Sequence, residues 1–211
     1  MPKKRVAVAM SGGVDSSLTA ALLKEAGYEV SGIHMRLWSN SSQNTSHLEH
    51  ACQVLNIPLH IFNLETEFHS LVIDHFCREY SLGRTPNPCV ICNQHIKFGL
   101  LLEEVLGMGA DYLATGHYAR IKQSPDGYRL LKAVDPAKDQ SYFLYTLRQR
   151  ELQHLLLPLG DLHKAEVRRM ADDRGLPTDD RRESQDICFI PDNDYRAFIA
   201  EYIPTKPGDI V

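Results

Sequence analysis

The residues whose types and spacing most clearly suggest a binding or catalytic role form the glycine turn at 11–17. Its sequence is Ser11-Gly12-Gly13-Val14-Asp15-Ser16-Ser17. It lies between an apolar strand expected at 5–10 and a helix expected at 14–26. Two adjacent glycines let backbone N–H groups approach an anion, and the helix directs its positive end at the same point. The serine hydroxyls can donate to phosphate, and Asp15 can share Mg²⁺ with it. The alternative is a plain turn capped by Asp15 or Ser16.

The cysteines are the second chemical feature. Cys89 and Cys92 form a Cys-x-x-Cys pair before a helix expected at 94–106, whereas Cys188 can reach them only through the fold. A helix N-terminus and Lys97 predict that Cys92 is more thiolate-like than a free cysteine. Three alternatives stay open: a zinc site completed by His95, a redox or sulfur-transfer pair, and a three-cysteine iron–sulfur site.

Alternating strands and helices must position these residues. The pattern predicts a doubly wound parallel α/β sheet with a small, mostly helical appendage. We expect the division to fall near residue 150, giving a larger domain at 1–150 and a small, mostly helical region at 151–211. Further strands are expected at 30–35, 58–63, 111–115 and 187–190, a hairpin at 118–122 and 128–134, and helices at 47–55, 65–80, 141–154, 163–174 and 194–202.

Composition excludes several classes of protein. The chain has 211 residues and a net charge of −4, so it is not a strongly basic nucleic-acid coat. No apolar run approaches the roughly 20 residues of a membrane span, and the N-terminus lacks the features of a signal peptide. The sequence therefore predicts a cytoplasmic protein without a membrane partner, and its five cysteines are expected to be reduced, catalytic or metal-bound.

The glycine turn resembles the PP-loop of the ATP pyrophosphatases. That resemblance implies cleavage of ATP between its α and β phosphates and adenylation of a substrate oxygen. In a sheet of this kind, the nucleotide enters the crevice at the carboxyl ends of the strands, where Met35 is expected to meet adenine. A core position at the strand end is the alternative for Met35.

Six motifs in order resemble those of the MnmA-type tRNA 2-thiouridylases. The resemblance implies conversion of the wobble uridine, position 34 of tRNA, to 2-thiouridine. The family usually continues into a C-terminal β-barrel region, which this sequence lacks. The motifs are the PP-loop, Gly83 to Asn93, Ile96-Lys97-Phe98, Ala114 to Ala119, Asp139 to Phe143 and Glu183 to Phe189.

The resemblance also implies that residues 1–150 are the ATP-binding catalytic domain and that 151–211 are a tRNA-binding or linker region with the second catalytic cysteine. It further assigns residues to roles. Cys92 matches the nucleophile, and Cys188 matches the persulfide carrier. Asn87, Pro88 and Cys89 match the segment near the target base. The tRNA-contacting positions are His117, Lys138, Asp139 and Gln140, and the ATP-binding positions are Ala9, Met10, Ser11, Gly12, Gly13, Val14, Asp15, Ser16, Met35 and Gly116.

Cys89 departs from the pattern, because some family members carry an aspartate there that is discussed as an acid or base. The third thiol adds a possible [4Fe-4S] cluster, held by Cys89, Cys92 and Cys188, to the implied ATP and Mg²⁺. The implied partners are the anticodon region of tRNA and a sulfur-donor protein, with the chain a monomer. The alternatives are a non-catalytic module that binds ATP or tRNA, and another PP-loop adenylating enzyme.

Overall fold

The computed structural model describes residues 2–38, 46–176, 187–190 and 194–203. Its main sheet has five parallel strands in the order β3-β2-β1-β4-β7. The strands are β1 (Arg5–Ala9), β2 (Glu29–Arg36), β3 (Leu59–Asn63), β4 (Tyr112–Ala114) and β7 (Leu155–Leu156). The predicted α/β class with a parallel sheet is confirmed.

The strand order reverses at β1, which pairs with β2 on one side and with β4 on the other. Val6, for example, lies opposite Val30 of β2 and Tyr112 of β4. Such a reversal opens a crevice beyond the carboxyl ends of the two diverging strands. The chain leaves β1 at this point and enters the glycine turn, so the fold places residues 10–13 in the crevice.

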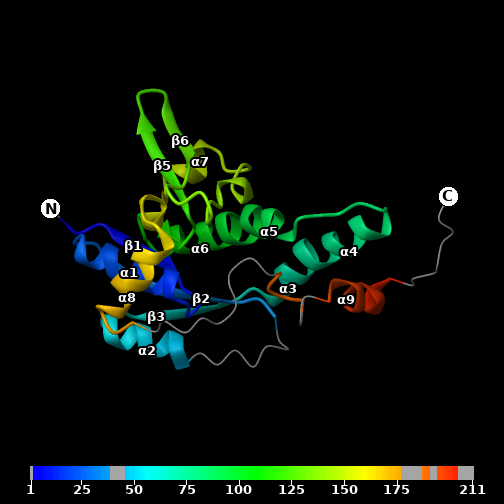
Figure 1. The fold of residues 1–211 in the computed structure, drawn as a ribbon, viewed down its shortest axis with the longest axis horizontal. Coiled ribbons are helices and arrows are strands. Elements are labelled where there is room, and N and C mark those ends of the chain that lie inside the picture. The colour runs from blue at the N-terminus through cyan, green and yellow to red at the C-terminus, as the bar shows by residue number, and fades with distance from the viewer. Residues whose placement is uncertain (1, 39–45, 177–186, 191–193, 204–211) are drawn as a thin grey trace.

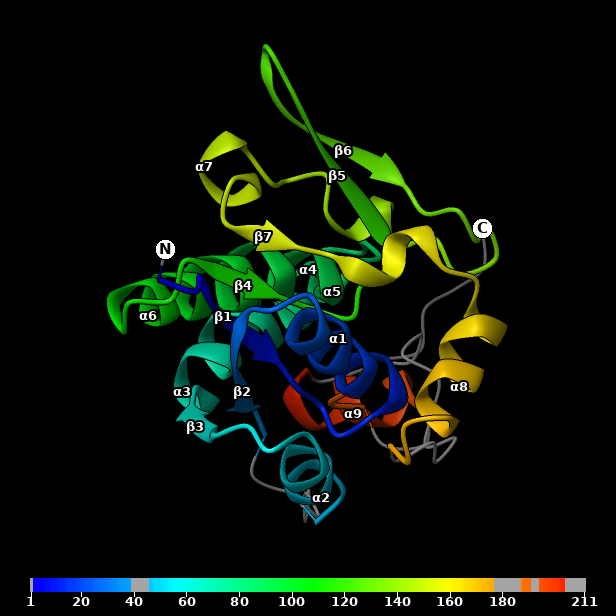
Figure 2. The same ribbon diagram turned by 90° about the vertical axis from the view of Figure 1, so that its left-hand side faces the viewer.

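Helices cover both faces of the sheet, as Figure 2 shows. Val6 and Val8 of β1 pack in one core with α1 (Val14–Glu25), α2 (Ser46–Leu55) and α8 (Lys164–Asp172). Ala7 points the opposite way, into a core with α6 (Leu102–Gly107) and the π-helix η2 (Cys92–Leu101). The period of two along β1 therefore separates the two faces.

A helical arm extends from the sheet on the side of α4 (Figure 1). It contains α3 (Glu65–Phe68), η1 (His69–Ile73), α4 (Asp74–Ser81), α5 (Pro88–Ile91) and α9 (Tyr195–Tyr202). Its aromatic core joins distant parts of the chain: the Phe189 ring lies 5.6 Å from that of Phe68, 5.5 Å from that of Phe76 and 5.3 Å from that of Phe198. This packing attaches the segment that carries Cys188 to the arm.

The predicted hairpin forms from β5 (Ala119–Ser124) and β6 (Gly127–Lys132) and projects from the body (Figures 1 and 2). The prediction of a single helix at 141–154 is wrong. The chain forms a 3-10 turn, η3 (Ser141–Phe143), and then a separate helix, α7 (Gln149–Leu152), because Arg148 between them is extended at φ −111° and ψ 179°. The Gln149 side chain instead binds the backbone of Tyr128 through two hydrogen bonds of 2.7 Å.

Two further expectations need correction. Residues 187–190 form a turn closed by a 3.1 Å hydrogen bond from Ile190 N to Ile187 O, not a strand. The helix expected from residue 94 begins at Pro88, so Cys89 and Cys92 lie in its first turns rather than in a loop. Proline is well tolerated as the first helical residue because its missing N–H is not needed there.

The strand β7, the 3-10 turn η4 (Pro158–Asp161) and α8 lie beyond the expected boundary at residue 150. They nevertheless complete the main sheet and pack against α1 and β5. The division at 150 thus remains a prediction about domain organisation, while the sheet itself spans it.

Candidate active site

The glycine turn is held by its own serines. Ser16 Oγ accepts a hydrogen bond from Ser11 N at 3.2 Å and donates to Gly13 O at 3.1 Å. Gly12 has φ of +82°, a left-handed conformation that favours glycine. The turn therefore presents its backbone at the N-terminus of the 12-residue helix α1, an arrangement suited to phosphate.

Gly116 brings the segment after β4 against this turn. A Cβ atom at position 116 would lie 3.0 Å from Asp15 C and 3.1 Å from Ser16 N. A larger residue would therefore displace the turn. The structure thus brings together Gly116 and the loop that the sequence predicts to bind ATP.

Asp15 already has two strong partners. Both of its carboxylate oxygens lie 2.7 Å from Lys164 Nζ, and Oδ1 also accepts a hydrogen bond from the Tyr118 hydroxyl at 2.9 Å. Tyr118 is buried, and both burial and the neighbouring Asp15 raise the pKa of its phenol. Sequence reasoning missed Lys164 and Tyr118 as site residues, because no local spacing links either of them to Asp15.

The carboxylate expected to share Mg²⁺ is therefore committed to an ammonium group. No group of three or more His, Cys, Asp or Glu side chains within the described ranges is arranged to hold a metal ion. Because Mg²⁺ is usually held by one or two carboxylates together with substrate phosphates, the ion at Asp15 stays a prediction, and we assign no step to it.

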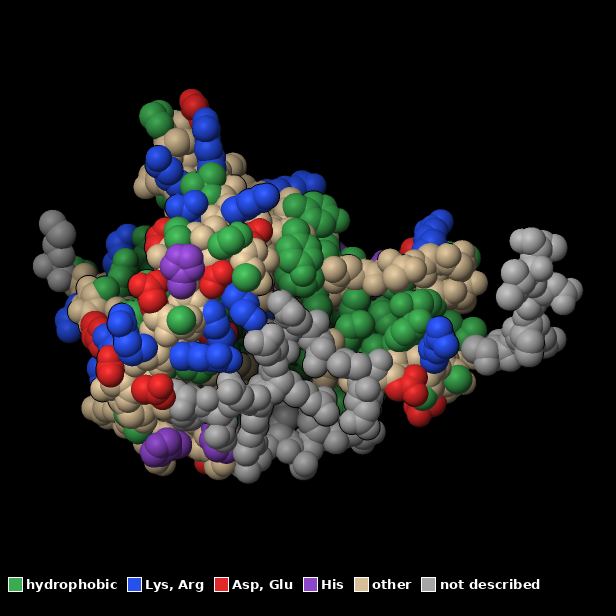
Figure 3. Space-filling model, in the orientation of Figure 1, with side chains coloured by type: hydrophobic (Ala, Val, Ile, Leu, Met, Phe, Trp, Pro, Cys, Tyr) green, Lys and Arg blue, Asp and Glu red, His purple; other side chains and the backbone are tan. Residues whose placement is uncertain are grey.

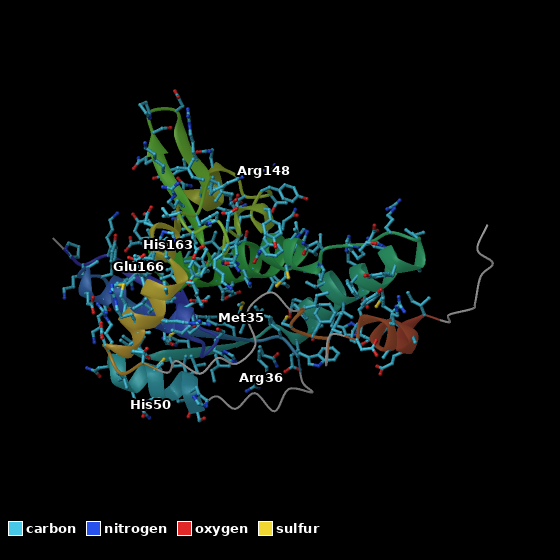
Figure 4. The ribbon with its side chains drawn as sticks, viewed as in Figure 1. Met35, Arg36, His50, Arg148, His163 and Glu166 are labelled. Carbon is cyan, nitrogen blue, oxygen red and sulfur yellow. The ribbon has the colours of Figure 1, made fainter. Side chains whose placement is uncertain are left out.

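Ala9 and Met35 lie at the carboxyl ends of β1 and β2, and both are half-buried. Figure 4 labels Met35 beside Arg36 at this end of the sheet. Met35 packs in two cores, one shared with the arm and the other with η2 and α6. This position agrees with a wall of the nucleotide crevice and also with the core alternative.

The three cysteines at positions 89, 92 and 188 converge. Asn87 caps α5 by accepting a 3.0 Å hydrogen bond from Cys89 N, and Pro88 is buried at the first helical position. Cys92 packs in one core with Phe189 and Ile190, the two residues that follow Cys188. Cys89 and Cys188 both raise the pKa of Cys92, and Cys89 raises that of Cys188, so the three sulfurs lie within electrostatic range of one another. Cys188 is exposed, Cys89 is half-buried and Cys92 is buried, and all three are free thiols.

The expectation that Cys92 is thiolate-like is wrong. Burial raises its pKa to about 12, and the nearby charge of Lys97 lowers it by less than burial raises it. Burial also raises the pKa of Cys89. Cys188 is exposed, yet enough protein surrounds its sulfur that desolvation raises its pKa too. The helix N-terminus is present, but desolvation dominates.

Among the described residues, no three His, Cys, Asp or Glu side chains are arranged to hold a metal ion. The iron–sulfur cluster at Cys89, Cys92 and Cys188 therefore stays a prediction, and we assign no step to it. The chemistry available at this site is that of free thiols: one buried, one half-buried and one exposed.

The residues expected to contact tRNA make internal bonds. His117 Nδ1 lies 2.8 Å from Thr115 Oγ1, and its surroundings lower its pKa well below 6.5, first through desolvation and then through Lys97. Asp139 accepts from Ala133 N and from Ser141 Oγ, each at 2.8 Å. Gln140 Oε1 accepts from Tyr118 N at 3.0 Å.

Lys138 is half-buried beside them. The contacts of these residues with tRNA stay predictions, and the start of the last motif, residues 183–186, lies outside the described residues.

Lys97 connects the parts of the site. Its charge acts on Cys89, Cys92 and Cys188, and also on His117. His117 follows Gly116, which contacts the glycine turn. The charge of Lys97 therefore acts both on the three thiols and on the residue that follows Gly116 at the predicted ATP site.

The sequence of the chain is similar to those of known tRNA-modifying proteins. The chain is 54% identical over 215 residues to the tRNA-specific 2-thiouridylase MnmA of Geotalea uraniireducens, covering 94% of this chain and 57% of that protein. It is 44% identical over 216 residues to the Staphylococcus aureus protein of the same name, covering 98% of this chain and 58% of the relative. The chain thus spans a little under three fifths of the length of these two relatives.

Two solved structures share the fold. One is the U34-tRNA thiolase NcsA from Methanococcus maripaludis with its [4Fe-4S] cluster, with a TM-score of 0.58 at 16% identity, covering 96% of this chain and 66% of that one. The other is a 4-thiouridine synthetase–RNA complex with bound ATP, with a TM-score of 0.59 at 17% identity. The match covers 82% of this chain and 41% of that one. At these identities the likeness establishes the fold alone.

Within the described residues, no helix is long and apolar enough to cross a membrane. A family model described as the tRNA methyl transferase HUP domain matches residues 4–192. The resemblance to MnmA-type proteins is thereby confirmed, and the chain belongs to this HUP-domain family.

Proposed function

We propose that the chain is the catalytic portion of an ATP-dependent tRNA sulfurtransferase that makes 2-thiouridine at the wobble position. The observation that carries the proposal is the convergence of Cys92 and Cys188 beside the helix whose Lys97 also reaches His117. The relatives named tRNA-specific 2-thiouridylase support the choice of substrate. Their greater length makes tRNA binding by this chain alone part of the proposal.

The chemistry requires activation of the base. The uridine C2 carbonyl is a poor electrophile, so its oxygen attacks the α phosphate of ATP and releases pyrophosphate. The C2 oxygen then leaves as part of AMP, a much better leaving group than oxide. The glycine turn at 11–13 and the N-terminus of α1 supply the N–H groups and the positive helix end that bind the phosphates in this proposal.

Sulfur reaches the base from a persulfide on Cys188, whose exposed position suits loading by a donor protein. The terminal sulfur attacks C2, and AMP departs. Cys92 then loses its proton and attacks Cys188 Sγ, which breaks the persulfide S–S bond and leaves the thiocarbonyl on the base. A Cys92–Cys188 disulfide results, and an external dithiol must reduce it before the next turnover.

The high pKa of Cys92 sets a requirement on this step. Burial raises the pKa of Cys92 to about 12, so the thiol is protonated near neutral pH and must give its proton to a base as it attacks.

The test is a thiolation assay with the 211-residue chain, ATP, a wobble-uridine tRNA transcript and a persulfide donor. Cys92→Ser and Cys188→Ser should each abolish 2-thiouridine formation while ATP binding survives. Cys77→Ser, which removes a buried thiol from α4, is the matched control and should keep activity. Thiolation at the wild-type rate by either Cys92→Ser or Cys188→Ser would contradict the proposed roles of these two thiols.

The same assay distinguishes the alternatives. A wild-type chain that binds ATP and tRNA but makes no 2-thiouridine is the non-catalytic module, for which the greater length of the relatives provides a reason. Iron and sulfide analysis after anaerobic purification tests the cluster route. A small-molecule acceptor for the adenylate leaves the three converging thiols without a role.

A further inference from the structure

Two tyrosine rings face solvent close to the cysteine site. Tyr142 is 58% exposed and Tyr145 is 71% exposed, although Leu144 between them is fully buried and Phe143 is half-buried. We call the pair Tyr142 and Tyr145 the tyrosine ledge. Figure 3 shows hydrophobic side chains gathered on the surface between the projecting hairpin and the helical arm. Exposed aromatic rings on an anchored segment are typical of binding surfaces rather than of cores.

The ledge is held rigidly. Asp139 accepts hydrogen bonds from Ser141 Oγ and Ala133 N, which fixes the turn that carries Tyr142. The Tyr142 ring packs on Phe143, with centroids 3.9 Å apart and a 35° angle between planes. A ring backed in this way loses little conformational entropy when a ligand stacks on its free face.

The ledge is also fixed relative to the cysteine helix. Asn93 follows Cys92 directly, and its Nδ2 donates to the backbone oxygen of Phe143 at 3.4 Å. Tyr142 lies within electrostatic range of Cys89. The buried Asn93 Oδ1 has no hydrogen-bond partner in the part of the chain that the structure describes. An unpaired buried acceptor at this junction favours a ligand that brings a donor N–H.

We propose that Tyr142 is the stacking surface for the target base, and that Tyr145 stacks on the neighbouring unpaired nucleotide. This inference rests on the proposed function and identifies the feature recognised as unpaired bases of an RNA loop. A base must leave its helical stack before a thiol can reach it, and proteins receive such bases on aromatic side chains. Uracil also carries an N3–H, a donor of the kind that Asn93 Oδ1 lacks among the residues that the structure describes.

The first experiment measures binding of an end-labelled anticodon stem-loop by fluorescence anisotropy. Tyr142→Ala should weaken binding by about tenfold or more, the usual effect of losing one base–aromatic contact, whereas Tyr142→Phe should keep it. The dependence of affinity on salt should not change, because no phosphate contact is removed. Tyr202→Ala removes a 39% exposed tyrosine from α9, outside the ledge, and should bind like wild type.

The second experiment places 5-iodouridine at the wobble position and irradiates the complex. The cross-link should map to Tyr142, and Tyr142→Ala should abolish it. An RNA duplex without unpaired bases should not form the cross-link.

The outcomes separate the two proposals. If Tyr142→Ala binds the stem-loop as the wild type does while the wild-type chain thiolates tRNA, the proposed role of the tyrosine ledge is wrong and the proposed function stands. A cross-link at a residue other than Tyr142 has the same meaning. Equal loss of loop and duplex binding in Tyr142→Ala overturns base stacking and assigns the ledge to a different partner. A wild-type chain that neither binds nor modifies tRNA overturns the proposed function and the ledge with it.

Discussion

Lys164 and Asp15 lie 149 positions apart in the sequence, yet the ammonium nitrogen of Lys164 contacts both carboxylate oxygens of Asp15 at 2.7 Å. Their side chains are only 18% and 19% exposed. The pair attaches the start of α8 to the start of α1 and neutralises the Asp15 carboxylate beside the glycine turn.

We predict that Lys164→Gln lowers the free energy of unfolding by about 1–2 kcal/mol, between the values typical of exposed and of fully buried pairs. Chemical denaturation of Lys164→Gln, Asp15→Asn and the double variant measures the coupling. Arg150→Gln is the control. Arg150 pairs with Glu103 at the same 2.7 Å, but the two side chains are 75% and 60% exposed. Strictly additive effects of Lys164→Gln and Asp15→Asn would show that the pair contributes nothing.

Gly116→Ala should both destabilise the fold and weaken ATP binding. The added Cβ would lie 3.0–3.1 Å from backbone and side-chain atoms of Asp15 and Ser16, so the glycine turn must shift. We expect a loss of about 1–3 kcal/mol, as for other overpacked sites. Calorimetric titration with ATP and thermal unfolding measure the two effects.

The matched control for this variant is Gly107→Ala. A Cβ at position 107 meets nothing within 4 Å, so this change should be neutral or slightly stabilising. Similar ATP affinities of the two variants would show that the contact between Gly116 and the turn is unimportant for the nucleotide.

Alkylation should discriminate sharply between Cys188 and Cys92. At pH 8 only about one Cys92 in ten thousand is ionised when the pKa is about 12, whereas Cys188 is exposed. Iodoacetamide should therefore modify Cys188 first, as followed by peptide mass spectrometry. Denaturation in urea should remove the difference. Modification of Cys92 as fast as Cys188 in the folded chain would contradict the burial of the Cys92 thiol.

The same thiol makes stability depend on pH. The unfolded thiol loses its proton near 9.0, whereas folded Cys92 keeps it to about 12. Stability contributed by Cys92 is therefore intact below pH 9 and falls as pH rises through this window, by about 1.4 kcal/mol per pH unit. Cys92→Ala should reduce the slope of unfolding free energy against pH in this range.

Reversing one charge on the hairpin should stabilise it. Lys122 lies directly opposite Arg129 in the antiparallel register, and both side chains are exposed. Like charges in this position repel, so Lys122→Glu should add about 0.2–1 kcal/mol in low salt, with a smaller gain at high salt. Lys132→Glu is the control, because Lys132 lies opposite Ala119. Equal gains from both changes would point to net charge rather than the cross-strand pair.

Local sequence was sufficient to predict the glycine turn, since a strand, two glycines and a helix follow each other within a few residues. The hairpin was equally local, because a turn sequence separates its two strands. The ion pair of Asp15 was not predictable in this way. Neither periodicity nor spacing connects residue 15 to residue 164, and only the packing of α8 on α1 brings them together.

The cysteine site also depends on contacts between distant residues that local sequence does not predict. Their convergence followed from the resemblance to a family, not from any spacing between residues 92 and 188. The pKa of Cys92 was predicted in the wrong direction because its helix position is visible in the sequence but its burial is not. Cys92 lies in an aromatic and aliphatic core that includes Phe189 and Ile190, residues nearly a hundred positions away.

The helical pitch of η2 determines how near the charge of Lys97 lies to the cysteine sulfurs. In an α-helix, residues five apart point about 140° away from one another. The π-helix that begins at Cys92 closes its hydrogen bonds over five residues instead, which turns Lys97 back toward the side of the helix that carries Cys92. If this segment returned to the ordinary α-helical pitch at unchanged length, the ammonium group would rotate away from the thiols, although no side chain in contact with sulfur had been replaced.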